Sequence, residues 1–346
     1  MARVELTGVR KDFGPFTAVS RIDLDIPSGA LVALLGPSGC GKTTCLRMIA
    51  GLDAPTEGAI LFDGVDMRDV PVQARDVGMV FQRFALFPHM TVENNVLFGL
   101  KVRGTPKPDA RARLDDILDV VQLREFRHRF PAQLSGGQMQ RVAIARTLIT
   151  NPRVLMMDEP LANLDTGLRG EMRQFIRTLQ QRLGITTIFV THDQVEAMEL
   201  ADQVAVIFDG RVAQYDRPDT LYHRPQSVDV ARFMGARNLF EAQLNGAGLA
   251  QTGFGDLQFE APHRAGPAQV LLRAEAIDLH EAPPADEQNV IAGVIKTREF
   301  FGSNVNYGVD CLGTQVTVSE PSRRMLEAGH PVWLSIAPHH IWVIQS

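Results

Sequence analysis

The sequence predicts an α/β domain followed by a small all-β domain. Over residues 1–235, short apolar runs typical of buried strands alternate with segments of helical periodicity, as expected for a sheet covered by helices. Beyond Gly235, glycine and proline recur, helical periodicity fades and short β-like runs follow one another, which is typical of a small barrel or sandwich over residues 236–346. A chain of 346 residues is long enough for two such domains.

Composition narrows the class of protein. Hydrophobic residues make up 45% and charged residues 22%, the proportions of an ordinary globular protein. The formal net charge of −5 lacks the basic excess typical of nucleic-acid binding, so we expect no nucleic-acid partner. Three cysteines without metal-ligand spacing indicate a reducing, cytoplasmic setting. Neither a signal peptide nor an apolar run of membrane-spanning length is present, so we expect any membrane role to act through a partner.

The strands and helices follow from periodicity and turn residues. A helical region is expected at about residues 90–150, and the strand–helix alternation up to about Phe233 predicts a largely parallel sheet. Helices are also expected at residues 45–50 and 168–183. Strands are predicted in the first domain at residues 4–7, 22–26, 31–35, 58–64, 77–81, 154–157 and 187–190, with a hairpin at 204–212, and in the second at 269–272, 290–295 and 332–336.

A glycine-rich segment, Gly-Pro-Ser-Gly-Cys-Gly-Lys-Thr-Thr at residues 36–44, joins a predicted strand to a predicted helix. Its glycines let successive N–H groups point at a polyphosphate, and the helix N-terminus adds partial positive charge. Lys42 would supply a charge for the β and γ phosphates, and the Thr43 hydroxyl is suited to Mg²⁺. Nine residues matching in this context disfavour a glycine turn without a ligand. The predicted nucleotide-binding residues of this loop are Ser38, Gly39, Cys40, Gly41, Lys42, Thr43 and Thr44.

Two aromatic segments are open to two interpretations each. Phe13 lies in a turn between the first two predicted strands, where its ring either stacks on a purine or fills a small core. Phe84, Leu86 and Phe87 lie in a loop just after Gln82 and before a proline. Such a loop is either a locally folded core segment or a docking surface.

Polar groups follow several of the predicted strands. Asp158 and Glu159 end a buried strand, a position that suits metal and water handling in an α/β protein with a phosphate loop. His192 follows the next strand, and its place relative to these groups favours a functional role. A Ser-Gly-Gly turn at Ser135 offers N–H groups to an anion, or is a plain helix N-cap. Asp165 is a candidate cap of the helix that follows it.

With these segments in order, residues 1–235 resemble the ATP-binding subunit of an ABC transporter, a P-loop NTPase domain with a helical sub-domain. The resemblance rests on a Walker A loop at residues 36–44, a Q-loop glutamine at Gln82 and a Leu-Ser-Gly-Gly-Gln signature at 134–138. Walker B lies at residues 154–158 with Glu159 next, a D-loop at 162–165, and the switch histidine is His192. The signature between Gln82 and Walker B is specific to this class.

The second domain resembles the OB-like TOBE domain of bacterial importer ATPases. Leu-Arg-Ala-Glu at residues 272–275 is similar to the Arg-Pro-Glu segment of such domains, with Ala274 in place of proline. Phe-Gly-Ser-Asn at residues 301–304 is similar to their aromatic-Gly turn. Phe13 stands where relatives often carry Tyr or Trp, and it keeps a ring face for stacking.

The resemblance implies roles for the site residues. Lys42, Gln82, Glu159 and His192 would be catalytic, with Glu159 polarising the attacking water and His192 holding the γ-phosphate. Thr43, Gln82 and Asp158 would ligate Mg²⁺. In a head-to-tail dimer, residues of the signature and the D-loop would complete the ATP site of the second copy. These residues are Ser135, Gly137, Gln138 and Asp165. Phe13 would stack on the adenine.

The resemblance also implies partners. A transmembrane permease would dock near Ala85, Leu86 and Phe87, placing the chain on the cytoplasmic face of the inner membrane, and an extracytoplasmic solute-binding protein would act indirectly. The whole-chain pattern favours a polyamine-type cargo, with ferric iron, an anion or a sugar as alternatives. The rival class, a soluble ABC ATPase acting on nucleic acid or the ribosome, usually has two cassettes or a coiled-coil insertion, which this chain lacks. A generic P-loop kinase would not need the signature.

Overall fold

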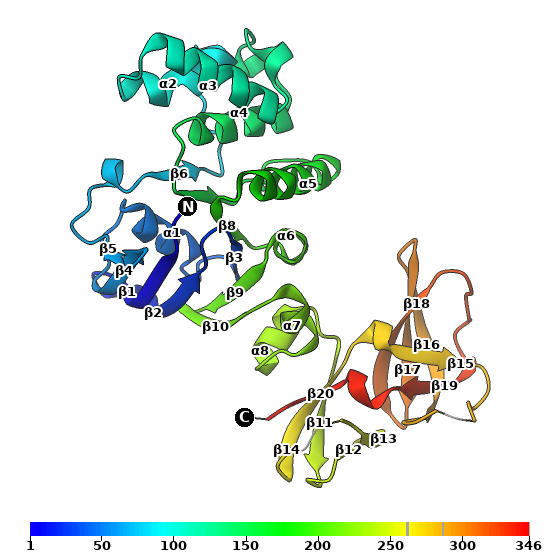
Figure 1. Ribbon diagram of the computed structural model, residues 1–346. Coiled ribbons are helices and arrows are strands. Elements are labelled where there is room, and N and C mark those ends of the chain that lie inside the picture. Colours follow the sequence, from blue (N-terminus) through cyan, green and yellow to red (C-terminus); the bar gives the residue numbers. More distant parts are fainter. Residues whose placement is uncertain (261–262, 286, 346) are drawn as a thin grey trace. The chain divides into compact units, whose positions relative to one another are not determined.

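The computed structural model describes residues 1–260, 263–285 and 287–345, and it forms two compact units, Met1–Pro218 and Asp219–Ser346 (Figure 1). The sequence placed the domain boundary at Gly235, whereas the structure groups residues 219–235 with the second unit. The physical reason is visible in the packing, because Ala231 is buried against Leu271 and Ile344. The two units are described separately below.

The first unit is built on a ten-stranded sheet. Five neighbouring strands, β9, β3, β8, β7 and β6, run parallel, while β1, β2, β4 and β5 form antiparallel pairs and β10 pairs antiparallel with β9. In spatial order the strands are β5 (Val65–Asp66), β4 (Glu57–Phe62), β1 (Val4–Phe13), β2 (Phe16–Ile26), β10 (Arg211–Asp216), β9 (Gln203–Phe208), β3 (Leu31–Leu35), β8 (Thr186–Thr191), β7 (Val154–Asp158) and β6 (Val77–Val80).

The expected largely parallel sheet is therefore only half correct. Parallel neighbours need a long crossover, but β1 and β2 are joined by a tight turn in which Phe13 pairs with Phe16. The parallel half carries the site. All residues of β3 and β8 are buried, as expected for central strands covered on both faces.

The helices of the first unit fall into two groups. α1 (Lys42–Ala50), α5 (Thr166–Leu183) and α6 (Gln194–Leu200) each connect or follow strands of the parallel half. α2 (Val92–Val102), α3 (Lys107–Val120) and α4 (Gly136–Leu148) gather apart from the strands (Figure 1). This second group has its own apolar core, in which Val96, Leu118 and Val142 are fully buried, so the helical sub-domain predicted at about residues 90–150 is present. Short 3-10 turns lie at η1 (Val72–Ala74), η2 (Arg124–Phe126) and η3 (Pro131–Gln133).

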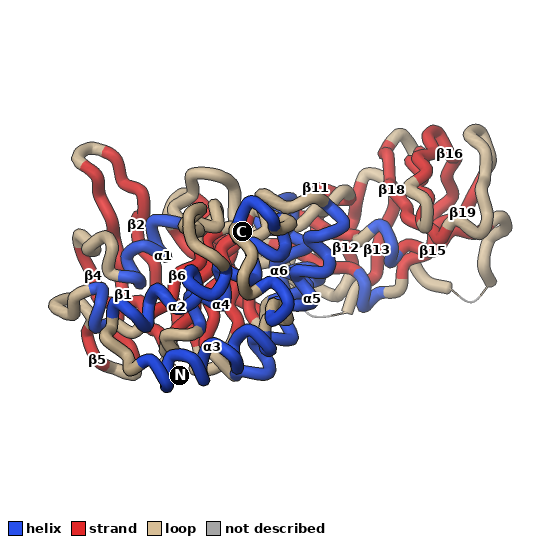
Figure 2. The backbone as a smooth tube through the Cα atoms, turned by 90° about the horizontal axis from the view of Figure 1, so that it is seen from above, coloured by secondary structure: helices blue, strands red, loops and turns tan. Residues whose placement is uncertain are grey.

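The second unit is mostly strand, as the red segments β11 to β19 in Figure 2 show. It starts with α7 (Pro218–His223) and α8 (Val228–Phe233) and forms two five-stranded antiparallel sheets. The first sheet is β13 (Gly255–Gln258), β12 (Leu249–Thr252), β11 (Asn238–Leu244), β14 (Gly266–Leu272) and β20 (Ile341–Ile344). The second is β15 (Ile277–His280), β19 (Pro331–Ile336), β16 (Ile291–Phe300), β17 (Asn304–Cys311) and β18 (Thr314–Pro321).

One hydrophobic core joins the two sheets of the second unit. Val270 from the first sheet and Tyr307 and Leu334 from the second belong to the same buried cluster. The 3-10 turns η4 (Ala274–Ala276) and η5 (Pro338–His340) connect the sheets at their ends. The small all-β domain predicted from the sequence is thus present. Within the described part of the chain, none of the helices has the length and apolar character that a bilayer span requires.

Candidate functional site

The loop at residues 36–44, called the phosphate loop below, is shaped by its glycines. Gly41 has a φ of 101° and stands as N-cap of α1 without a side-chain cap, so the first N–H groups of this helix remain available to a ligand. A Cβ on Gly41 would lie 2.5 Å from the carbonyl oxygen of Ala18, and one on Gly36 would lie 2.3 Å from that of Ile207. Only glycine fits at these two positions.

Lys42 lies inside the curve of the loop. Its side chain is 5% exposed, and its Nζ donates to the carbonyl oxygens of Gly36 and Pro37 at 2.8 Å each. The Cys40 thiol is also buried, 3.7 Å from the same Nζ, and burial raises its pKa. Ser38 and Gly39 are exposed at the rim. The loop therefore holds a fixed ammonium group beside a helix N-terminus that has no side-chain cap.

Thr43 meets Asp158 at the edge of the sheet. The Thr43 hydroxyl donates to Oδ1 of Asp158 at 2.9 Å. The two residues come together because β3 and β7 both pair in parallel with β8, which brings their carboxyl ends to one edge. Burial raises the pKa of the Asp158 carboxyl. A hydroxyl and a partly buried carboxylate thus lie next to the first turn of α1.

Glu159 and His192 form a second pair at this edge. Glu159 has a φ of 44°, unusual for a residue other than glycine, and its N–H donates to the carbonyl oxygen of Val190 at 3.0 Å. Nδ1 of His192 lies 3.2 Å from Oε2 of Glu159. Behind them, the Thr191 hydroxyl donates to the buried Glu196 carboxylate at 2.6 Å, and burial raises the pKa of Glu196. These contacts hold the carboxyl end of β8 in place.

Gln82 follows β6 at the same edge, with an exposed side chain. Its carbonyl oxygen accepts from Nδ2 of Asn163 at 2.7 Å, which ties it to the segment after Glu159. The hydrogen bonds of the described residues do not connect the Gln82 side chain to Thr43 or Asp158.

The Leu-Ser-Gly-Gly-Gln segment at residues 134–138, called the signature turn below, begins α4 in the helical group (Figure 1). Ser135 Oγ accepts from the Gln138 N–H at 3.3 Å, and Gln138 Oε1 accepts from the Ser135 N–H at 2.9 Å. Gly137 is buried, and a Cβ there would lie 2.9 Å from Cδ1 of Leu168. The N-cap interpretation of Ser135 is therefore correct for this structure. Across the described residues, no hydrogen bond or ion pair links the signature turn to the phosphate loop.

Asp165 and Phe13 are also placed. Asp165 caps α5 by accepting from the Leu168 N–H at 3.0 Å, as expected from its position just before the helix. The Phe13 ring is 48% exposed at the β1–β2 turn, with Nζ of Lys11 4.9 Å from its centroid. The structure thus excludes the core interpretation for Phe13.

The loop at residues 83–89, called the aromatic loop below, is held by two side chains that sequence reasoning missed. Arg146 in α4 donates to the carbonyl oxygens of Ala85 at 2.7 Å and Phe84 at 3.3 Å. The buried Asn95 of α2 accepts from the Phe87 N–H at 2.9 Å and donates to its carbonyl oxygen at 3.1 Å. The available signal was a charged residue directly after the apolar run Val-Ala-Ile-Ala in a predicted helix.

Both units of this chain contain segments that match known protein families. A family model described as "ABC transporter" matches residues 19–162, and one described as "TOBE domain" matches residues 270–344. The chain is 43% identical to the Fe(3+) ions import ATP-binding protein FbpC of Rhizobium etli, covering 99% of this chain and 98% of that protein. It is 42% identical to the protein of the same name from Escherichia coli, covering 99% and 97%.

Solved structures also resemble part of this chain. One is cbiO1 from Clostridium perfringens, described as part of the ABC transporter complex cbiONQ, with a TM-score of 0.59 and 31% identity over 63% of this chain and 89% of that one. Another is a dimeric post-hydrolysis state of an ATP-binding cassette bound to ADP and Pi, with a TM-score of 0.55 and 34% identity over 62% of this chain and 98% of that one. The chain therefore belongs to the ATP-binding proteins of ABC transporters, subunits that bind and hydrolyse ATP to drive transport, and it carries a TOBE domain.

Proposed function

We propose that two copies of this chain hydrolyse ATP at composite sites and thereby drive import of ferric iron through a separate permease. The observation that carries the proposal is the set of groups at one sheet edge, where Lys42, the Thr43–Asp158 pair and the Glu159–His192 pair surround an uncapped helix N-terminus. Phosphoryl transfer needs charge neutralisation and an oriented water, and this edge offers both.

Each group has a proposed role. Lys42 and the N–H groups of the phosphate loop, with Ser38 and Thr44 at its rim, hold the β and γ phosphates. Glu159 polarises the attacking water, and His192, 3.2 Å from it, holds the γ-phosphate and keeps that carboxylate oriented.

The donor set also fits Mg²⁺. The Thr43 hydroxyl and the Asp158 carboxylate are hard oxygen ligands 2.9 Å apart, and the Gln82 amide oxygen extends from the same edge. Burial makes an ionised Asp158 carboxylate costly unless a cation lies beside it, in line with its raised pKa. When bound, Mg²⁺ would neutralise charge on the phosphate oxygens. Thr43, Gln82 and Asp158 would hold it.

The second half of each site is proposed to come from another copy. Within one chain the signature turn has no described link to the phosphate loop, and a related cassette is known as a dimer bound to ADP and Pi. In a head-to-tail dimer, Ser135, Gly137 and Gln138 would face the γ-phosphate of the partner copy, with Asp165 nearby. Phe13 would stack on the adenine of its own ATP.

The membrane partner is proposed to dock on the aromatic loop. Phe87 packs on Phe98 with ring centroids 4.5 Å apart, and Phe98 is itself 37% exposed. Arg146 and Asn95 hold the loop backbone in place, and Ala85 within this loop has a positive φ of 50°. A rigid apolar edge beside Gln82 suits a cytoplasmic helix of a permease. This would place the chain on the cytoplasmic face of the membrane, with the solute-binding protein acting from the other side.

Ferric iron is the proposed cargo, because the full-length relatives at 42–43% identity are named for Fe(3+) import. We prefer ferric iron to the polyamine-type cargo that the whole-chain pattern favoured, because no particular residue supports a polyamine. Uptake of radiolabelled ferric iron and of radiolabelled spermidine in cells with and without this chain separates the two. Iron uptake that depends on the chain is expected, and spermidine uptake alone would contradict the proposal.

Glu159→Gln tests the hydrolytic site. The change keeps the shape of the side chain but removes the carboxylate that polarises water, so we expect ATP to be bound while hydrolysis falls by about 100-fold or more. Gel filtration with ATP is expected to show a trapped dimer. Glu171→Gln, an exposed substitution in α5, is the matched control and should hydrolyse ATP normally. Full turnover in Glu159→Gln would refute the role given to Glu159.

A further inference from the structure

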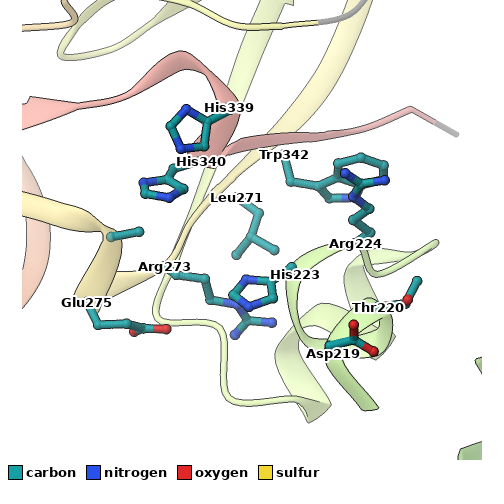
Figure 3. Close-up of a pocket in the computed structure, with 11 residues that line it drawn as sticks. Asp219, Thr220, His223, Arg224, Leu271, Arg273, Glu275, His339, His340 and Trp342 are labelled. Atoms are coloured by element: carbon teal, nitrogen blue, oxygen red, sulfur yellow. The ribbon is translucent and has the colours of Figure 1, made fainter. Parts of the chain in front are cut away.

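A cavity of about 660 Å³ is lined only by residues of the second unit, none of which is proposed to take part in the ATP site (Figure 3). Three segments far apart in the sequence form its wall, at residues 219–224, 271–276 and 339–342. Its volume falls in the range of small-molecule sites. The side chains around it determine what kind of molecule it suits.

Three imidazoles line this cavity without a hydrogen-bonding partner. His223, His339 and His340 make ring contacts only, His223 with Tyr222 at 5.2 Å between centroids and the other two with each other at 4.1 Å. Among the described residues, none of these three side chains takes part in a hydrogen bond or an ion pair, whereas His280 and His330 of the same unit each lie against a glutamate. Their ring N–H groups are therefore available to a ligand.

Two guanidinium groups add fixed positive charge. Arg273 is 5% exposed, and it donates to the carbonyl oxygen of Met234 at 3.1 Å and to that of Tyr222 while its guanidinium lies 3.7 Å from the Tyr222 ring centroid. Arg224 lies with its guanidinium 5.8 Å from the Trp342 ring centroid. Arg273 is thus immobile in the wall, and Trp342 offers an apolar face beside Arg224.

The acidic groups of the wall offset the two guanidinium charges but do not exceed them. Asp219 and Glu275 are the carboxylates of the wall, and Glu275 already accepts from the Tyr222 hydroxyl at 2.7 Å. The two carboxylates balance the two guanidinium groups, which leaves three imidazole donors for an acceptor-only ligand. A metal is disfavoured, because no group of three His, Cys, Asp or Glu side chains among the described residues is placed to hold one.

We infer that this cavity binds a small anion carrying carboxylate or phosphate groups, which accepts hydrogen bonds from His223, His339 and His340 near the charges of Arg224 and Arg273. A ligand site in the TOBE-containing unit would let the transporter respond to a solute other than ATP and its cargo. The inference does not depend on the cargo or on the roles proposed for the ATP site.

Calorimetric titration of the full chain tests the inference, with inorganic phosphate and with citrate as separate probes. All titrations use a Lys42→Ala background, so that phosphate binding at the phosphate loop does not contribute. We expect saturable binding of at least one probe with one site per chain. The double variant His223→Ala/His340→Ala should weaken it by about tenfold or more. His128→Ala, an exposed histidine of the first unit, should leave it unchanged.

Each outcome of these titrations either supports or overturns the inference. Binding of phosphate alone, of citrate alone, or of both supports the inference and identifies the group that is recognised. Because His223 and His340 are exposed, the double variant is expected to keep the fold, and its thermal unfolding without ligand should match that of the parent. Binding of neither anion, or binding that is unchanged in the double variant, would overturn the inference.

Discussion

Two helix N-termini of the first unit begin in opposite ways. α1 starts after Gly41, which has no side chain to cap it, so in the described part of the chain no N-cap side chain occupies its first N–H groups. α4 starts at Ser135 with a complete capping box, in which Ser135 and Gln138 satisfy each other's N–H groups. Both ends belong to the proposed ATP site, yet only the first is open in a single copy.

The difference would explain why one chain carries only half of the proposed ATP site. The N-terminus of α1 is preorganised for an anion, with the Lys42 ammonium group beside it. The signature turn must exchange an internal cap for a phosphate oxygen. A neutral N-cap contributes roughly 1 kcal/mol. A hydrogen bond to a charged oxygen contributes about 1.5–3 kcal/mol. The exchange therefore favours ATP once the partner copy presents it.

The largest expected effect is on the uncapped helix. Gly41→Ala places a Cβ 2.5 Å from the Ala18 carbonyl oxygen at a φ of 101°, so the loop must shift. We expect ATP affinity to fall by on the order of 100-fold, because left-handed strain of about 1–2 kcal/mol adds to the clash. Gly39→Ala is the matched control, since Gly39 also has a positive φ of 84° but open space around it. Titration with a non-hydrolysable ATP analogue should show a much smaller loss there, and equal losses would contradict the account.

A smaller effect is expected at the capped helix. Ser135→Ala and Thr91→Ala each remove an N-cap, at α4 and α2, and each should lower the free energy of unfolding by about 1 kcal/mol. Only Ser135→Ala should also slow ATP hydrolysis, by about tenfold, because Ser135 alone is assigned to a ligand as well as to a helix. Denaturant unfolding and steady-state hydrolysis measure the two effects. If both variants hydrolyse ATP at the same rate, Ser135 acts only as a helix cap and its proposed contact with ATP is contradicted.

The smallest expected effect concerns the adenine. Phe13→Ala should weaken ATP binding by about fivefold, since the loss of one stacked ring costs roughly 1 kcal/mol. Phe16, across the same turn and 62% exposed, is the control, and Phe16→Ala should bind ATP normally. Equal weakening in both variants would indicate that the hairpin, rather than the ring of Phe13, matters.

The sequence predicted what depends on local patterns. The phosphate loop is contiguous, so its place between β3 and α1 could be predicted from the sequence, and the structure shows close backbone packing at Gly36 and Gly41 and a hydrogen bond from Lys42 to the loop backbone. The parallel strands and the two-unit organisation also followed from periodicity. Of the antiparallel pairs, the β9–β10 hairpin was predicted, whereas the pairing of β1 with β2 and β4 was missed, because alternating strands carry no mark of their pairing direction.

Features built from distant residues were out of reach. Arg146 reaches Ala85 across 61 positions, and no spacing rule connects them. The cavity of the second unit is assembled from three separate segments, none of which is a motif. For Ser135, the pattern allowed both a cap and an anion contact, because both interactions use the same N-terminal geometry. For Asp165, the pattern indicated a cap, and the contact with ATP was implied only by the family resemblance.

The most direct test of the shared site mixes two inactive variants. Lys42→Ala disables the phosphate loop of one copy, and Ser135→Arg blocks the signature turn of another. In a mixed head-to-tail dimer, one site combines both defects and the other has neither. The account predicts that ATP hydrolysis, absent from each variant alone, appears on mixing. If copurification confirms the mixed dimer and hydrolysis stays absent, the claim that each ATP lies between two copies is contradicted.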